Sequence, residues 1–510
     1  MSIAIGIAIS IICFSFHIML ASKLDSLKVF DQFNVLFEAD PNAVLPAFTD
    51  APSDPNARPP LVHANLREFI GAPVRLIANI ISIFSFSTVD SAKLRLKLAL
   101  LVCPFFASLF YFFLHRFLIR LKFSLPMASI FTLLSFVSFS QIIFGSIPES
   151  FSISNFTIML AFCLFSYLRG KRGFFPFLLW FILGVFAAGV TITNLVTISI
   201  LFFISEIYEQ KHLLKSILRT TGLAILILAS TLTIYTVSQT IHGNKNINVD
   251  HEAGFVKWHV VRNPQIILNK MLTFPTPLMN SLVAPNPRVI PINYYGLSHS
   301  ASDRYPDYFA FDYDYRMGLS GPLFTINNLV GTVLLVLLFI PIYKPLGFIF
   351  KPIFSHKIFS PKAATIVGML IILFSFLLDP HLHGAKIVFG FKQYILFLCG
   401  FLIILIRWLI YFLNAHTDRV ESNREILYIS AASLIIIFYN FCLHSIFGSE
   451  RFLYSQHWLA PLILLLSVLF GFNLRLSQGR RIGVALSFVV LVAANNALVI
   501  HHIFNTLSTY

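Results

Sequence analysis

Long apolar segments are the feature that most constrains how this chain can fold. About thirteen runs have roughly the 17 to 25 predominantly apolar residues that span a bilayer as a helix. The runs cover residues 2–21, 96–115, 124–145, 152–168, 174–191, 193–208, 220–241, 322–343, 363–379, 393–413, 427–447, 458–474 and 482–502. Only 12% of the residues are charged, too few to cover a soluble protein of this length. We therefore predict an all-α, polytopic membrane protein whose 510 residues form a single integral membrane domain.

Basic residues gather in alternate joints between these runs, and the alternation predicts an orientation. The basic joints contain Arg116, Arg120 and Lys122; Arg169, Lys171 and Arg172; Lys211, Lys215 and Arg219; Lys344, Lys351, Lys357 and Lys362; and Arg475, Arg480 and Arg481. The positive-inside rule places such short joints in the cytoplasm and the others outside. The net charge of +15 is scattered over these joints rather than gathered on one face, which argues against nucleic-acid binding.

Two of the predicted external segments are long. The first, residues 22–95, contains an apolar stretch from Leu66 to Ser85 that begins with an Arg-Glu pair and includes Pro73. We expect a juxtamembrane helix there, since a further crossing would invert every later basic joint. The second, residues 242–321, is nearly charge-balanced and is expected to fold over the membrane surface.

The acidic residues Glu38 and Asp40 of the first external segment are candidate catalytic groups. Charged side chains are nearly absent from the middles of the predicted helices, unlike those of many ion-coupled transporters. In an extended segment, residues two apart point the same way, so both carboxylates could converge on one cation or hydroxyl. Asp40 before Pro41 also fits a helix N-cap followed by proline, and the two roles can coexist.

Further candidates lie at predicted external helix ends. Glu149, Asn194, Tyr454 and His457 are candidate substrate contacts, and the candidate phosphate-binding residues are Arg451, Arg262, Lys257 and Arg304. Equally, Ser150 or Ser152 could cap the helix that follows, with the acid Glu149 favourable near its N-terminus. Residues such as Asn194 more often satisfy neighbouring backbone groups, and Arg451 could pair with Glu450. The five cysteines have no metal-type spacing and are interpreted as packing residues.

Three short motifs resemble those of the GT-C superfamily of integral membrane glycosyltransferases. That family has many transmembrane helices and a large first external loop with juxtamembrane helices and a modified DxD motif, of which ExD is a variant. Glu38-Ala39-Asp40 matches that motif in type and place, and the segments Ile147 to Ser152 and Glu450 to His457 look like those of uncharacterised bacterial members. Relatives often carry His-Pro-Leu after the acidic motif; this chain has Pro-Pro-Leu-Val followed by His63, which is a further substrate-contact candidate.

The resemblance implies transfer of a sugar from a polyprenyl-phosphate-linked donor to a glycan, lipid or protein acceptor. The reaction would take place on the external face of a bacterial cytoplasmic (inner) membrane and contribute to a cell-envelope glycan. Asp40 or Glu38 would take the proton of the acceptor hydroxyl during an inverting attack, and basic side chains would stabilise the lipid phosphate. Some relatives use a divalent cation, Mg²⁺ or Mn²⁺, for which Glu38 and Asp40 are the candidate ligands.

Two other functions remain open at this point. A flippase or other transporter of lipid-linked oligosaccharides would need a continuous polar path through the helices. An oligosaccharide polymerase or ligase would also act externally on polyprenyl-linked substrates, and the size of its product would distinguish it.

Overall fold

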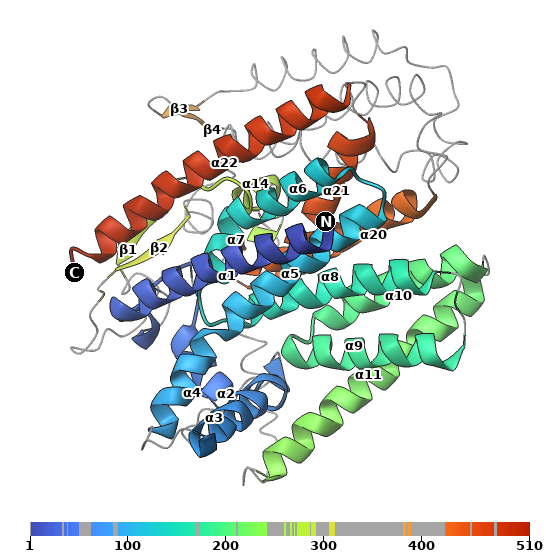
Figure 1. Ribbon diagram of the computed structural model, residues 1–510, viewed down its shortest axis with the longest axis horizontal. Coiled ribbons are helices and arrows are strands. Elements are labelled where there is room, and N and C mark those ends of the chain that lie inside the picture. Colours follow the sequence, from blue (N-terminus) through green and yellow to red (C-terminus); the bar gives the residue numbers. More distant parts are fainter. Residues whose placement is uncertain are drawn as a thin grey trace.

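The computed structural model shows a mostly helical chain (Figure 1). It describes residues 2–32, 35–37, 39–49, 63–84, 90–169, 171, 173–210, 213–241, 260–261, 266–267, 270, 273–285, 287–291, 305, 307–311, 381–383, 386–388, 424–448, 451–473 and 477–510. The helices of the first half are α1 (Ser2–Ser26), η1 (Val29–Asp31), α2 (Pro41–Thr49), η3 (Arg67–Gly71), α3 (Ala72–Phe84), α4 (Ser91–Leu100), α5 (Val102–Arg120), α6 (Leu125–Val137), α7 (Phe139–Phe144), α8 (Ser150–Leu168), α9 (Phe174–Val190), α10 (Asn194–Gln210) and α11 (Leu213–Ile241). The second half contributes α14 (Pro275–Asn280), β1 (Arg288–Pro291), β2 (Asp307–Ala310), β3 (His381–His383), β4 (Lys386–Val388), α20 (Arg424–Ile446), η7 (Phe452–Tyr454), α21 (Gln456–Val468), η8 (Leu469–Asn473) and α22 (Gln478–Leu507).

Within the described residues, six helical segments are long and apolar enough to cross a bilayer, as expected of a membrane protein. They are Ser2–Ser26, Ser91–Arg120, Ser150–Leu168, Leu213–Ile241, Tyr428–Ile446 and Gln478–Leu507. Four shorter apolar helices accompany them: Leu125–Val137, Phe174–Val190, Asn194–Tyr208 and Gln456–Gly471. The predicted runs 322–343, 363–379 and 393–413 lie outside the described residues, so the count of about thirteen spans stays a prediction.

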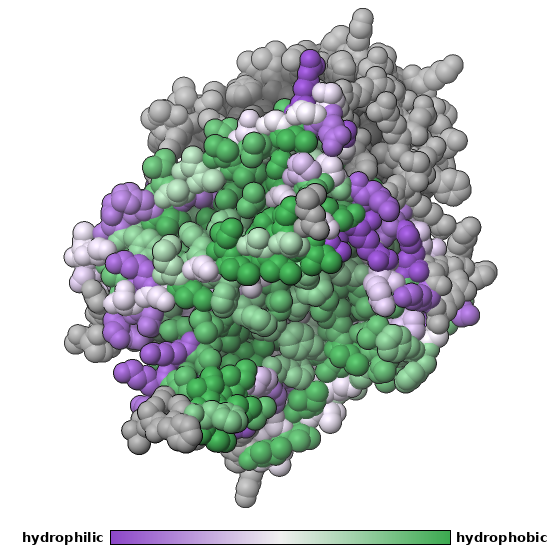
Figure 2. All heavy atoms as spheres, viewed as in Figure 1, coloured by the Kyte–Doolittle hydropathy of each residue, from purple (hydrophilic) through white to green (hydrophobic). Residues whose placement is uncertain are grey.

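Helix α8 forms the centre of the bundle. In Figure 1, α1, α5 and α8 run side by side, and α8 also packs against α9, α10 and α21. In the most apolar part of α8, 78% of the residues are buried. The corresponding fractions are 17% in α11 and 28% in α22. These outer helices expose large apolar side chains such as Leu226 and Leu491. Figure 2 shows hydrophobic residues across the middle of one face and hydrophilic residues towards its left and right edges, as a bilayer requires.

The predicted run 124–145 is broken into two helices. Ser138 has the extended backbone dihedrals φ −64° and ψ 137°, which end α6 and separate it from α7. Beyond the break, the backbone N–H groups of Phe139 and Ser140 donate to the carbonyl groups of Leu282 and Ser281, at 3.2 and 3.1 Å. Contacts from the second half of the chain thus replace the helical hydrogen bonds, and the expected continuous helix is wrong here.

Short strands join the two long segments that were predicted to be external, a feature that the all-α prediction missed. β1 and β2 pair antiparallel, with Arg288 opposite Ala310. The N–H of Phe309 in β2 donates to the carbonyl of Val35, and the N–H of Phe37 donates to the carbonyl of Phe309, both at 2.9 Å. The stretch 35–37 therefore lies against the strand pair. β3 and β4 form a second antiparallel pair.

The apolar stretch of the first external segment is helical, as predicted. It forms η3 and α3, and Pro73 lies close to the junction between them. α3 packs against α2 and α4. Its place at a membrane interface stays a prediction.

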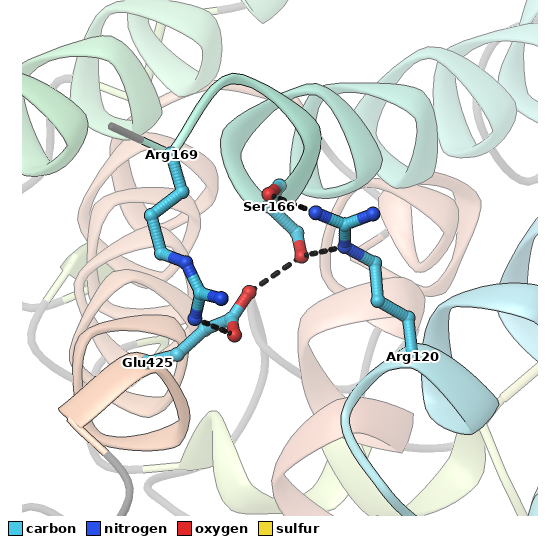
Figure 3. Close-up of polar contacts among 4 residues, drawn as sticks. All are labelled: Arg120, Ser166, Arg169 and Glu425. Atoms are coloured by element: carbon cyan, nitrogen blue, oxygen red, sulfur yellow. Dashed lines mark hydrogen bonds and ion pairs between the residues drawn. The ribbon is translucent and has the colours of Figure 1, made fainter. Parts of the chain in front are cut away.

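The described basic joints meet at one end of the bundle. Arg120 of α5 and Arg169 after α8 both contact a cluster formed by Ser166 and Glu425, the latter in the first turn of α20 (Figure 3). Arg219 of α11 pairs with Glu206 of α10 at 3.1 Å. Glu149 lies at the opposite end of α8. At 1.5 Å per residue the two ends of α8 are roughly 28 Å apart, close to the thickness of a hydrocarbon core.

Candidate functional site

A direct hydrogen bond joins two of the predicted site residues. The backbone N–H of Asp40 donates to Oε1 of Glu149 at 2.7 Å. Asp40 stands at the N-cap position of α2, because its carbonyl accepts from the N–H of Val44 at 3.2 Å. Its predicted place before a proline-initiated helix is confirmed. The acidic loop and the turn before α8 therefore form one site.

The backbone before Asp40 is a turn, which corrects the extended segment assumed from the sequence. The carbonyl of Leu36 accepts from the N–H of Ala39 at 3.0 Å. Phe37 inside this turn has φ 56°, in the left-handed region that non-glycine residues rarely occupy. Its buried ring packs between Phe311 and Phe452, with centroids at 4.8 and 5.1 Å. These aromatic contacts hold the turn in place. Glu38 lies outside the described residues.

Glu149 is a buried carboxyl group, with only 4% of its surface exposed. It is the N-cap of α8, and its Oε2 accepts from the N–H of Ser150 at 3.1 Å. The cap expected from Ser150 or Ser152 is therefore wrong, because Glu149 occupies that position and both serines lie inside the helix. Burial, and then the charge of Asp40, raise its pKa to about 8, against the opposing effect of the two N–H donors. The carboxyl group therefore holds its proton at neutral pH.

Cys103 of α5 fixes the backbone of Glu149. Its Sγ accepts from the N–H of Glu149 at 3.3 Å and donates to the carbonyl of the same residue at 3.0 Å. The sequence analysis assigned this cysteine only a packing role. Nothing in the apolar run around it points to Glu149.

Aromatic and imidazole rings lie beside Asp40 and Glu149. Phe151, in the first turn of α8, contacts Tyr454 and His457 with ring centroids at 5.9 and 5.8 Å. His444 of α20 stacks on Tyr454 at 4.0 Å and on His457 at 5.7 Å. Within the described part of the chain, the ring nitrogens of His457 have no hydrogen-bond partner. Such rings are suited to contact a substrate.

His444 is a site residue that the sequence analysis did not find, because it lies inside an apolar run. Gly448, just after α20, helps to place Tyr454, whose ring stacks on that of His444. This glycine has φ 85°, and a Cβ atom there would collide with the ring of Tyr454. The chain can therefore leave α20 with Tyr454 close against its backbone.

His63 and Asn194 occupy different positions around this site. Nδ1 of His63 makes a 2.9 Å hydrogen bond with the carbonyl of Val190, at the C-terminus of α9. Burial lowers the pKa of His63, and the hydrogen bond to Val190 opposes that effect. Asn194 is 1% exposed and donates to the carbonyl of Ala187 at 3.3 Å. The alternative role foreseen for Asn194, satisfying neighbouring backbone, is what the structure shows.

Arg451 is buried, with 1% of its surface exposed. Its Nη1 donates to the carbonyl of Lys270 and to Oγ1 of Thr273, both at 2.9 Å. These contacts connect the start of η7 to the chain before α14, so a role in phosphate binding stays a prediction. The other predicted phosphate ligands, Arg262, Lys257 and Arg304, lie outside the described residues.

The divalent cation predicted from the resemblance has only one of its two candidate ligands, Asp40, among the described residues. None of the described His, Cys, Asp and Glu residues form a group of three or more suited to hold a metal ion. Both oxygens of Glu149 already accept backbone hydrogen bonds. The cation at Glu38 and Asp40 stays a prediction, because Glu38 lies outside the described residues.

Comparisons with protein-family models, with curated proteins and with solved structures find no match to this chain. The function is therefore inferred from the site itself. The site combines Asp40 in a loop, the protonated carboxyl group of Glu149 and a set of rings, at the end of α8 opposite the basic cluster.

Proposed function

We propose that the chain is a membrane glycosyltransferase of the GT-C type, which moves a sugar from a polyprenyl-phosphate-linked donor to an acceptor. The hydrogen bond between Asp40 and Glu149 gives the main support, since it joins two motifs that share this resemblance. The rings of Tyr454 and His457, from the third motif, lie beside them. In this proposal the chain has about thirteen spans, and the site faces the outside of a bacterial inner membrane.

The proposed reaction forms one bond and breaks one bond at the anomeric carbon. The acceptor hydroxyl loses its proton to the carboxylate of Asp40 or Glu38 while its oxygen attacks the carbon. The bond from that carbon to the phosphate oxygen breaks on the opposite face, and the lipid phosphate leaves with the electron pair. Inversion at the carbon follows. Basic side chains near the site would balance the charge of the leaving phosphate.

Glu149 has a different task in this scheme. Its carboxyl group accepts hydrogen bonds from two backbone N–H groups and, when protonated, can also donate one. It is therefore suited to hold a sugar oxygen while Asp40 acts as the base. Two carboxyl groups with separate protonation states would divide the roles of donor and base.

Loss of the Asp40 carboxylate is the direct test. The purified chain in detergent would receive radiolabelled polyprenyl-phosphate sugars and a pool of acceptor lipids and glycans, with product followed by chromatography. Asp40→Asn is expected to lower the rate by at least about a hundredfold, because general-base catalysis contributes that much. Asp31→Asn is the matched control, since it removes an equally charged but exposed carboxylate from the same segment. Full activity of Asp40→Asn would contradict the proposed base.

A flippase is the second candidate, and one observation favours it. Polar side chains occur inside the bundle: the ring nitrogens of His17 contact Ser146 at 2.9 Å and Tyr111 at 2.8 Å, and Asn155 donates to Gln141 at 3.0 Å. Proteoliposomes with a fluorescent lipid-linked sugar separate the two functions. A flippase moves the lipid between leaflets without a new bond, whereas the transferase forms a new glycosidic product; a polymerase or ligase would form a longer one.

A further inference from the structure

A groove opens between α5 and α8 at the basic end of the bundle. Its volume is about 490 Å³, within the range of roughly 300 to 1,000 Å³ that ligand sites have. Its apolar wall includes Phe113, Leu160 and Leu164, and Arg116, Arg120 and Tyr167 also line it. None of the described residues that line this groove is acidic.

The two arginines of the groove carry charge that no described carboxylate neutralises. Arg120 donates through Nε and Nη2 to the hydroxyl and carbonyl oxygens of Ser166, both at 2.7 Å. Glu425, the acid of this cluster, accepts from Ser166 and pairs with Arg169 instead (Figure 3). Arg116 donates through Nη1 to the hydroxyl of Ser2 at 3.0 Å. In the described part of the chain, neither Arg116 nor Arg120 forms an ion pair.

A third cation stands beside the groove. Nζ of Lys171 lies 3.8 Å from the ring centroid of Tyr167. Two positive side chains thus line the groove and a third contacts its lining residue Tyr167. The described acids near them, Glu425 and Glu206, are already paired with Arg169 and Arg219. An anion at this place would be favoured by charge.

The walls of the groove belong to two segments that can cross a bilayer, Ser91–Arg120 and Ser150–Leu168. Phe113, Leu160 and Leu164 are only half buried, so they are open to the surroundings of the bundle. At the level of the hydrocarbon, those surroundings are acyl chains. A basic pocket between transmembrane helices is the usual setting for an anionic lipid head group.

We propose that this groove binds an anionic phospholipid of the leaflet at the basic end. The phosphate lies between Arg116 and Arg120, and one acyl chain lies along Phe113, Leu160 and Leu164. This site is distinct from the proposed glycosyltransferase site, at the other end of α8, and does not depend on that proposal.

Lipid titration of the full chain tests the proposal. The protein in detergent would be titrated with dioleoylphosphatidylglycerol or dioleoylphosphatidylcholine, and bound lipid counted by native mass spectrometry. Phosphatidylglycerol is expected to bind about tenfold more tightly, because two arginines act on its net charge. The double variant Arg116→Gln/Arg120→Gln should lose this preference. The control Lys215→Gln/Arg480→Gln removes two exposed charges outside the groove lining and should keep it.

A second variant guards against misfolding. Leu164→Trp fills the groove and retains both arginines, so it should lower phosphatidylglycerol binding about tenfold with an unchanged thermal unfolding midpoint. Equal binding of the two lipids to the unaltered protein would overturn the proposal. So would undiminished phosphatidylglycerol binding in Leu164→Trp, or complete displacement of the lipid by inorganic phosphate, which would indicate a site for the free anion only.

Discussion

Glu149 is the residue whose chemistry depends most on its surroundings. An exposed glutamate ionises near pH 4.5, whereas this one holds its proton to about pH 8. Between these values the folded chain keeps a proton that the unfolded chain has released. The free energy of unfolding therefore falls as the pH rises through this window, and levels off above about pH 8.

Replacement of Glu149 should remove this pH dependence. We expect the thermal unfolding midpoint of the unaltered protein in detergent to drop between about pH 5 and about pH 8. Glu149→Gln keeps an amide oxygen for one N–H donor but has no titrating proton, so its midpoint should change less over this range. Asp31→Asn should retain the full drop. Equal slopes for Glu149→Gln and the unaltered protein would show that Glu149 does not titrate there.

Single residues differ in how well the sequence revealed them. Asp40, Glu149, Tyr454 and His457 were found because they lie in polar turns at the predicted external ends of apolar runs. In the structure Asp40 contacts Glu149, and Phe151 beside Glu149 contacts Tyr454 and His457. His444 could not be found in this way, since a histidine inside an apolar run looks like a packing residue until another ring stacks on it.

At the scale of elements, the lengths of the apolar runs predicted the helices but not the breaks within them. The run 124–145 is apolar throughout, and the break at Ser138 depends on hydrogen bonds from Leu282 and Ser281. Those partners lie far along the chain, so no local pattern contains them. The left-handed turn at Phe37 was missed for the same reason, because distant aromatic rings hold it.

The contact between η3 and α9 gives an element-scale prediction. Gly189 at the end of α9 accepts from the N–H of Asn65 at 2.9 Å, and a Cβ atom there would collide with the ring of Phe69. Gly189→Ala is expected to destabilise the fold by roughly 1 to 3 kcal/mol. Chemical or thermal unfolding in detergent measures this change.

Gly222 of α11 provides the control for that substitution. Apart from its chain neighbours and the backbone of its own helix, no described atom lies within 4 Å of the position that its Cβ atom would take. Gly222→Ala should therefore leave the stability unchanged or raise it by up to about 1 kcal/mol, since alanine favours a helix. If Gly189→Ala and Gly222→Ala have the same effect on stability, close packing of η3 on α9 is not the reason that residue 189 must be glycine.

For the whole molecule, the segregation of charge predicts sidedness. Basic joints meet at one end of the bundle and the acidic site lies at the other, so one experiment can test the orientation. Asp31→Cys and Lys215→Cys place exposed thiols near the two ends. A membrane-impermeant maleimide should label Asp31→Cys in intact cells, and Lys215→Cys only after permeabilisation. The unsubstituted chain gives the background, and the reverse pattern would place the acidic site in the cytoplasm.

The contact of residues 35–37 with β2 has a consequence for synthesis of the chain. The ribosome delivers the acidic loop early, directly after α1, whereas Phe309 and the rings at Tyr454 and His457 follow much later. Until then the loop lacks the strand and the aromatic wall that shape it. The first helices therefore enter the membrane before the site is assembled. A chain whose translation stops after α11 would contain the acidic motif but could not form the site.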